Sequence, residues 1–121
     1  MRGGPFKDLI VWQKSRQLAL KTYSATKDFP KDEIYGLRNQ VRRAVVSVPS
    51  NIAEGHRRGS KKEFTQFLKI ARGSLAEAET QIILSTDLKF IRDEISEQLL
   101  NDIDEIGRML NGLITSLNVD D

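Results

Sequence analysis

The chain has 121 residues, a net charge of +2 and no cysteine. This length predicts a single domain over residues 1–121, and the absence of cysteine excludes disulfides, thiolate metal sites and cysteine catalysis. Because the sequence contains neither an apolar stretch of roughly 18 residues nor a secretory signal, we expect a cytoplasmic protein without a membrane partner.

The charges are distributed unevenly along the chain. Residues 1–75 contain 16 Lys and Arg against 6 Asp and Glu, whereas residues 76–121 contain 3 against 11. A basic first part suits an anionic partner such as nucleic acid. The alternative is that the acidic part packs beside the basic part and cancels much of its field. The composition leaves both interpretations open.

The first helix is expected over residues 8–27, with Asp8 as its N-cap and Phe29-Pro30 beyond its end. Its larger apolar residues recur at helical spacing on one side, and we assign that side to the core: Leu9, Trp12, Ala19, Leu20 and Tyr23. This assignment places Trp12 and Tyr23 in the interior and not on a surface that stacks on nucleic-acid bases.

The second helix is expected over residues 32–55, and its last part reads Ser47-Val-Pro-Ser-Asn-Ile-Ala-Glu-Gly55. Apolar residues keep one buried face through the proline: Ile34, Leu37, Val41, Ala44, Val45, Val48 and Ile52. Because Pro49 has no amide hydrogen to donate to the carbonyl of Val45, we expect a kink at this point. Gly55 is expected to end the helix in a left-handed conformation.

The third helix is expected to begin at Ser60 and to run to about residue 86, because Ser60 and Glu63 have the spacing of a capping box. A glycine inside a helix costs up to about 1 kcal/mol relative to alanine, so Gly73 predicts the close approach of another backbone. The expected core positions are Phe64, Phe67, Leu68, Ala71, Leu75, Ala78 and Ile82.

The fourth helix is expected over residues 93–117, with Asp93 as its N-cap. Its apolar positions form one continuous stripe: Ile95, Leu99, Ile103, Ile106, Leu110, Leu113 and Leu117. No strand pattern competes with the four helices. Four long helices with short connections predict an all-α, antiparallel up-down-up-down four-helix bundle with a proline-kinked second helix.

A second apolar stripe lies nearly opposite the faces assigned to the core. It comprises Val11, Leu18 and Ala25 in the first helix and Val46 and Ala53 in the second. One bundle core cannot bury two opposite faces, so this stripe predicts a subunit interface. The alternative is that these are singly exposed apolar residues, which are normal on soluble proteins.

The residue inventory argues against catalysis. His56 is the only histidine, and Glu54 lies two residues away, a spacing that does not bring helical side chains together. The chain has no Glu-x-x-His motif of di-metal bundles, and its Gly55-His-Arg-Arg-Gly59 segment lacks the strand and the Gly-Lys-Thr ending of a nucleotide loop. We therefore expect no enzymatic activity, no catalytic residue, no metal and no cofactor.

Basic residues surround the start of the third helix. Arg57, Arg58, Lys61 and Lys62 lie within six residues of one another, beside the free amides of a helix N-terminus, and this arrangement predicts phosphate binding. Arg43, opposite the core stripe, is expected to extend this RNA-binding or DNA-binding surface. A solvated basic connector is the alternative. Arg38 and Arg42 are expected to pair with acids such as Asp102 or Glu105.

The chain also resembles a known family. In order, it contains Phe6-Lys-Asp-Leu-Ile-Val-Trp-Gln-Lys14, Phe29-Pro30, Tyr35-Gly-Leu37, Gln40-Val-Arg-Arg43, the Ser47–Gly55 segment and Phe64-x-x-Phe-Leu-x-Ile-Ala-x-Gly-Ser-Leu-x-Glu77. Together these segments resemble the bacterial four-helix-bundle proteins named after reading frames in intervening sequences of 23S ribosomal RNA genes.

The resemblance implies a ring-like homopentamer of four-helix protomers with no established catalytic activity. A related protein is the accessory component of diversity-generating retroelements, a basic pentamer that associates with a reverse transcriptase and nucleic acid. We therefore expect a non-enzymatic oligomeric binding or scaffold protein whose partner is RNA, DNA or a nucleic-acid enzyme. The alternative is a structural module that binds only protein.

Overall fold

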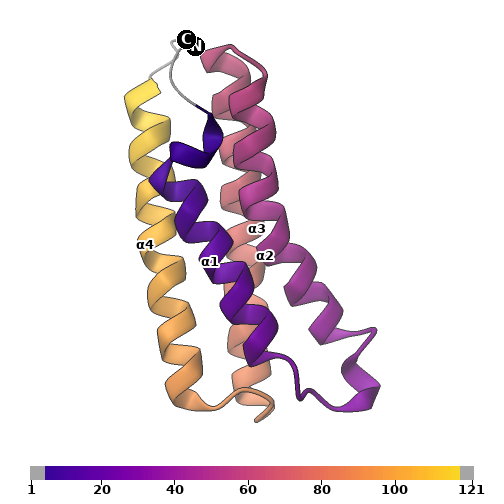
Figure 1. Cartoon of the computed structure of the whole chain (residues 1–121). Helices are drawn as coiled ribbons and strands as arrows, with labels where there is room; N and C mark the ends of the chain where they lie inside the picture. The colour runs from indigo at the N-terminus through magenta and orange to yellow at the C-terminus, as the bar shows by residue number, and fades with distance from the viewer. Residues whose placement is uncertain (1–4, 118–121) are drawn as a thin grey trace.

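The structure is a computed structural model that describes residues 5–117 (Figure 1). It contains four α-helices: α1 Ile10–Ala25, α2 Leu37–Arg57, α3 Lys61–Asp87 and α4 Asp93–Leu117. Two 3-10 helices precede α1 and α2: η1 Phe6–Asp8 and η2 Lys31–Glu33. No strand occurs between residues 5 and 117, and the helices lie side by side, which confirms the all-α four-helix bundle. Over the same range, no helix combines the length and the apolarity needed to cross a membrane.

The core runs between the facing stripes of the helices. The predicted core faces of α2, α3 and α4 are confirmed, with these residues buried: Val41, Ala44, Val45, Val48 and Ile52; Phe64, Leu68, Ala71, Leu75, Ala78 and Ile82; Leu99, Ile103, Ile106 and Leu110. The α2–α3 pair packs most extensively. Small residues permit this approach, since Ser47 Oγ lies 2.8 Å from Ser74 Oγ in the seam between the two helices.

The predicted core face of α1 is wrong in part. Val11 and Leu18, which the sequence assigned to a subunit interface, are buried inside the bundle, and Ala25 is partly buried against the same core. Leu20 and Tyr23, which were assigned to the core, are instead exposed. The side of Val11 and Leu18 is therefore the fully buried one, while the predicted core residues Leu9, Trp12 and Ala19 pack partly against the core.

Buried hydroxyl groups explain why the side of Val11 and Leu18 faces the core. Ser15, Thr22 and Thr26 are buried on the core side of the first helix and its C-terminal end. Each hydroxyl donates to the carbonyl four residues earlier: Ser15 to Val11 at 2.9 Å, Thr22 to Leu18 at 2.8 Å and Thr26 to Thr22 at 2.8 Å. A hydroxyl that is satisfied by its own backbone is cheap to bury, so these polar residues belong to the core face.

Several predicted helix ends are shifted. Asp8 is no N-cap of α1, because it lies in η1 and α1 begins at Ile10 after Leu9. A turn separates η2 from α2, so α2 begins at Leu37 and not near residue 32. The helix continues through Pro49 as one α-helix, and the kink stays a prediction.

The glycines have other roles than predicted. Gly55 does not end α2, which continues to Arg57. The left-handed glycine of the connector is Gly59, whose φ is +84°. Gly73 has open space around it, so no backbone approaches it closely. The Ser60 half of the predicted capping box is confirmed, because Ser60 Oγ accepts a hydrogen bond from the Glu63 amide at 3.1 Å. Glu63 Oε1 in turn accepts from the Ser60 hydroxyl at 3.1 Å.

Ion pairs join the basic first helix to the acidic fourth helix. Lys14 Nζ lies 3.5 Å from Glu105 Oε1, and Lys21 Nζ lies 2.9 Å from Asp102 Oδ2. The alternative interpretation of the charge distribution thus holds for this seam, where basic and acidic helices pack together. Lysines of α1, and not Arg38 or Arg42, pair with Asp102 and Glu105.

Candidate functional site

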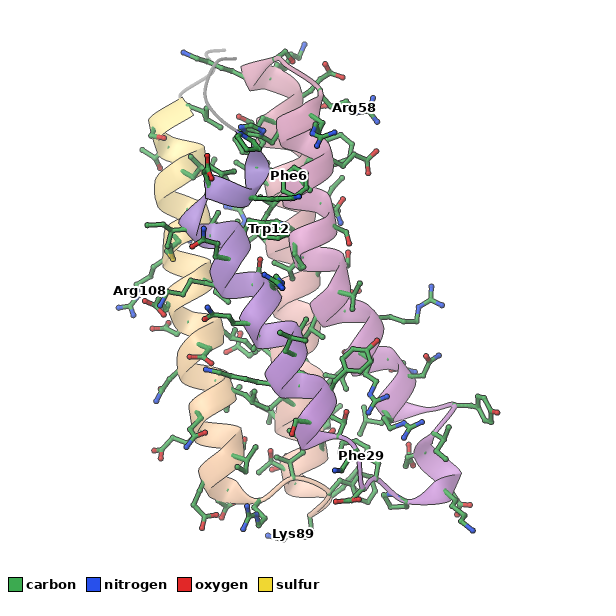
Figure 2. All side chains as sticks on the ribbon, viewed as in Figure 1. Phe6, Trp12, Phe29, Arg58, Lys89 and Arg108 are labelled. Atoms are coloured by element: carbon green, nitrogen blue, oxygen red, sulfur yellow. The ribbon has the colours of Figure 1, made fainter. Side chains whose placement is uncertain are left out.

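The predicted basic residues of the connector gather at one end of the bundle. α2 ends at Arg57 and α3 begins at Lys61, so both helices contribute to this surface, which we call the basic end: Arg57, Arg58, Lys61 and Lys62. In Figure 2, Arg58 and Phe6 lie toward this end, and Lys89 lies at the opposite end of the bundle. The connector itself is short because Gly59 turns the chain directly into the Ser60 cap.

Arg58 is already engaged by its neighbours. Its guanidinium lies 3.0 Å from Glu54 Oε2 and 3.8 Å from Glu63 Oε2, and it lies over the Phe67 ring at 5.0 Å. Two carboxylates therefore offset its charge locally. Arg58 thus links the end of α2 to the start of α3, and its charge is less available to a ligand than that of an unpaired arginine.

Within the described part of the chain, the other cations of the basic end have no carboxylate partner. Lys61 and Lys62 are exposed, and among residues 5–117 neither lies within ion-pair distance of an acid. Arg57 lies over the Phe6 ring at 5.1 Å, which ties η1 to α2. Since the Ser60 side chain satisfies only the amide of Glu63, helix geometry leaves the amides of Lys61 and Lys62 pointing outward beside their own charges.

Arg43 lies away from the basic end. It precedes Arg57 by fourteen residues on the same helix, which corresponds to about 21 Å along the axis. It lines a polar groove between α2 and α3 together with Gln40, Ser47, Ser74 and Glu77. The structure therefore does not bring Arg43 together with the other four predicted nucleic-acid-binding residues.

An apolar groove runs between α1 and α2 on the outside of the bundle. This α1–α2 groove has a volume of about 520 Å³ and is lined by Phe6, Trp12, Arg16, Ala19, Leu20, Tyr23, Val46, Pro49, Ser50 and Ala53. The exposed fractions of Leu20, Tyr23 and Val46 are 63%, 42% and 41%. Large apolar side chains are thus left in contact with water beside one another, which is unusual for an isolated protomer.

Guanidinium groups cover the aromatic residues of this groove. Arg16 lies over Trp12 at 5.8 Å, and Arg42 lies over Tyr23 at 4.3 Å, in addition to Arg57 over Phe6. Arg42 also donates to Thr26 Oγ1 and to the Tyr23 carbonyl at 2.9 and 3.1 Å. In the described part of the chain no carboxylate pairs with any of these three arginines, so the groove carries a positive rim.

Comparison with known proteins establishes the family. The family model described as 23S rRNA-intervening sequence protein matches residues 7–112, which is nearly all of this chain. The chain belongs to the 23S rRNA-intervening sequence protein family.

A solved structure of a related protein has the same fold. The crystal structure of a protein of unknown function from the S23 ribosomal protein family of Bacteroides thetaiotaomicron matches with a TM-score of 0.80 and 26% sequence identity. The match covers 87% of this chain and 98% of that one. A search of curated proteins found no match.

In this 23S rRNA-intervening sequence protein, the structure divides the predicted interface residues into three groups. Val46 and Ala53 line the α1–α2 groove, as an outward face requires. Val11 and Leu18 lie in the core, so these two residues cannot form the predicted interface without opening the bundle. Ala25 is only partly buried and also lines a surface groove beside Lys21 and Asp28, so its predicted role stays open. On α1 the groove is lined instead by Trp12, Ala19, Leu20 and Tyr23.

One sequence signal could have identified the groove. Ser15 and Thr22 are seven residues apart and share the face of Val11 and Leu18, and small hydroxyl residues at heptad spacing are compatible with burial.

His56, predicted in a solvated connector, instead lies in the last turn of α2 with its ring 5.5 Å from that of Phe64. Among residues 5–117, no three His, Asp or Glu residues are grouped so as to hold a metal ion.

Proposed function

We propose that this protein is a non-enzymatic cytoplasmic scaffold that assembles from copies of itself and binds nucleic acid or a nucleic-acid enzyme. The observation that carries the proposal is the α1–α2 groove, an apolar surface with a positive rim on an otherwise charged bundle. Such a surface supports association with another macromolecule.

Self-association is the first part of this function. Burial of Leu20, Tyr23 and Val46 against another copy would remove apolar area from water at roughly 25 cal/mol per Å². The family resemblance implies a homopentamer, and a ring of this kind repeats every surface of the protomer around one axis.

Nucleic-acid binding is the second part, and the basic end supports it. Arg57, Lys61 and Lys62 have no acidic partner in the described chain, and two outward amides accompany the lysines. Repetition in an oligomer multiplies this modest cluster, and affinity for a polyanion grows with the number of phosphates that are neutralised. Arg43 would form a separate contact about 21 Å along α2.

An electrophoretic mobility titration tests the nucleic-acid part. The protein is titrated with structured RNA and with duplex DNA at low and at physiological salt. We expect both to be shifted with little sequence preference and with a strong salt dependence. The variant Lys61→Glu/Lys62→Glu should weaken binding about tenfold or more at low salt and should flatten the salt dependence.

The matched control is Lys27→Glu/Lys69→Glu, which makes the same charge change at exposed positions outside the basic end. It should weaken binding much less. If wild-type protein shifts neither nucleic acid at low salt, the alternative function applies, that of an assembly module that binds only protein. The α1–α2 groove supports that alternative equally well, so the titration decides between the two.

A further inference from the structure

Tyr35 is the most exposed large apolar side chain of the described chain, with 92% of its surface accessible. It lies in the turn between η2 and α2. This turn projects sideways from one end of the bundle (Figure 1). An aromatic side chain in this position gains nothing from its own protomer, because almost none of its surface is covered.

The turn around Tyr35 is held by specific contacts. Glu33 Oε1 accepts a hydrogen bond from the Leu37 amide at 3.0 Å and so caps the start of α2. A Cβ on Gly36 would lie 2.9 Å from the same oxygen, so the glycine makes room for this cap. The Gly36 amide also donates to the Glu33 carbonyl at 3.2 Å. The backbone on both sides of Tyr35 is therefore fixed before any partner arrives, which lowers the entropy cost of using it as an anchor.

We propose that Tyr35 of one copy inserts into the α1–α2 groove of a second copy. The groove is apolar along its floor, and its volume of about 520 Å³ is ample for one aromatic side chain. Ser50 lines it as well, and its Oγ, which donates to the Val46 carbonyl at 2.8 Å, can accept a hydrogen bond from the phenol. This inference rests on the self-association in the proposed function and names the two surfaces that meet.

Charge complementarity favours this occupant. Arg16 lines the groove, and Arg42 and Arg57 lie over the Tyr23 and Phe6 rings that line it. None of these three arginines pairs with an acid between residues 5 and 117. The segment that carries Tyr35 contains Asp28 and Asp32, both exposed and both without an ion pair in the same range. Between α1 and α2, residues 26–36 contain Lys27 and Lys31 as well, so with Glu33 the net charge of this segment is −1, and Arg38 lies just beyond it.

The proposed contact between Tyr35 and the groove joins two different surfaces of the protomer. Each chain offers one Tyr35 and one groove, on different elements of the bundle. A contact between two different surfaces is head-to-tail, and repetition of it closes into a ring or extends as a filament. A two-fold dimer in which groove meets groove is a different arrangement, and the two can be separated by experiment.

Complementary variants test the proposal in sedimentation velocity. Tyr35→Ala keeps an intact groove, and Leu20→Glu keeps an intact Tyr35. Each variant alone should raise the concentration of half-assembly by about 30-fold, the effect typical of losing an aromatic anchor. An equimolar mixture should form a dimer, because each pair of chains then contains one complete contact. Leu88→Glu, exposed and outside both surfaces, should assemble as wild type does.

Trp12 supplies an independent readout, because it is the only tryptophan and lines the groove. Its emission should shift to shorter wavelength as the wild-type concentration rises through assembly. Tyr35→Ala should lack this shift over the same range. Circular dichroism checks that both variants keep wild-type helicity, which is expected for substitutions at exposed positions.

Each other outcome overturns the proposal in a recognisable way. If Tyr35→Ala assembles like wild type while Leu20→Glu does not, a different segment fills the groove, and the proposed self-association survives. If the mixture stays monomeric while both variants are dissociated, the two surfaces do not meet. If wild type stays monomeric at every concentration, the groove serves a different protein, and the proposed self-association fails as well.

Discussion

Phe67 occupies the space that a side chain on Gly55 would need. A Cβ added to Gly55 would lie 2.5 Å from Phe67 Cβ, where α2 and α3 pack. Any larger residue at position 55 must push the two helices apart. The glycine is thus required by packing and not by backbone conformation, since α2 passes through it without interruption.

Gly55→Ala should therefore lower the free energy of unfolding by about 1–3 kcal/mol, the usual cost of overpacking a core. The matched control is Gly73→Ala in α3, where nothing lies within 4 Å of the added Cβ. That substitution should raise stability by up to about 1 kcal/mol, because alanine is the better helix former. Urea unfolding followed by circular dichroism measures both. Equal effects of the two substitutions would contradict the packing argument.

A pair of leucines tests the corrected face of α1. Leu18→Ala should cost about 2–5 kcal/mol of stability, since Leu18 is fully buried in the core. Leu20→Ala should change the stability of the protomer by less than about 0.5 kcal/mol, since Leu20 is mostly exposed. Thermal unfolding at low protein concentration compares them. A larger loss for Leu20 than for Leu18 would restore the face that the sequence pattern favoured.

Thr22→Val tests whether the buried hydroxyls of α1 serve only their own backbone. The Thr22 hydroxyl donates to the Leu18 carbonyl, which also accepts the regular helical bond. Removal of the hydroxyl leaves no buried group unsatisfied, so we expect a change in unfolding free energy below about 1 kcal/mol. A loss above about 3 kcal/mol would indicate a further partner for Thr22.

Pro49→Ala tests the predicted kink of α2. The alanine restores an amide hydrogen for the Val45 carbonyl and leaves the buried stripe unchanged, so the fold and the helicity should be retained. Crystal structures of both proteins measure the angle between the helix axes before and after position 49. An identical angle in the two would show that Pro49 does not bend this helix.

The sequence predicted those parts of the fold in which apolar periodicity and burial coincide. The stripes of α2 and α4 are continuous, and Ser60 with Glu63 marks the start of α3 by local hydrogen bonds alone. The apolar stripes and the Ser60 cap each depend only on residues that are close in sequence, and for this reason the structure confirms both.

The face of α1 could not be predicted in the same way. The sequence offered two apolar stripes, and size favoured the one with Trp12 and Tyr23. The choice depends on hydroxyl groups that bond to their own helix and on the Arg42 guanidinium of α2, which covers the Tyr23 ring of α1. These contacts involve residues far apart in sequence, or polar residues that a hydropathy pattern counts against burial.

The basic end was predicted as a cluster, but the state of each charge was not. Arg58 lies between Glu54 and Glu63, whereas Lys61 and Lys62 remain without acidic partners in the described chain. The helix spacing of Glu54 and Arg58 is visible in the sequence. The contact with Glu63 needs the turn at Gly59, which no local pattern specifies.

The lysines of α1 that face α4 help to determine the handedness of the bundle, which burial of the apolar stripes alone does not decide. Four helices with the same buried stripes can be arranged with either hand, as a left-turning or a right-turning bundle. Lys14 and Lys21, seven residues apart, mark the flank of α1 that meets the acidic helix, while the opposite flank carries the apolar groove. Each exposed pair contributes no more than about 1 kcal/mol. Their effect is selective: in the bundle of the other hand, α1 would turn its lysines away from α4, so surface charge helps the chain choose one of two mirror-related topologies.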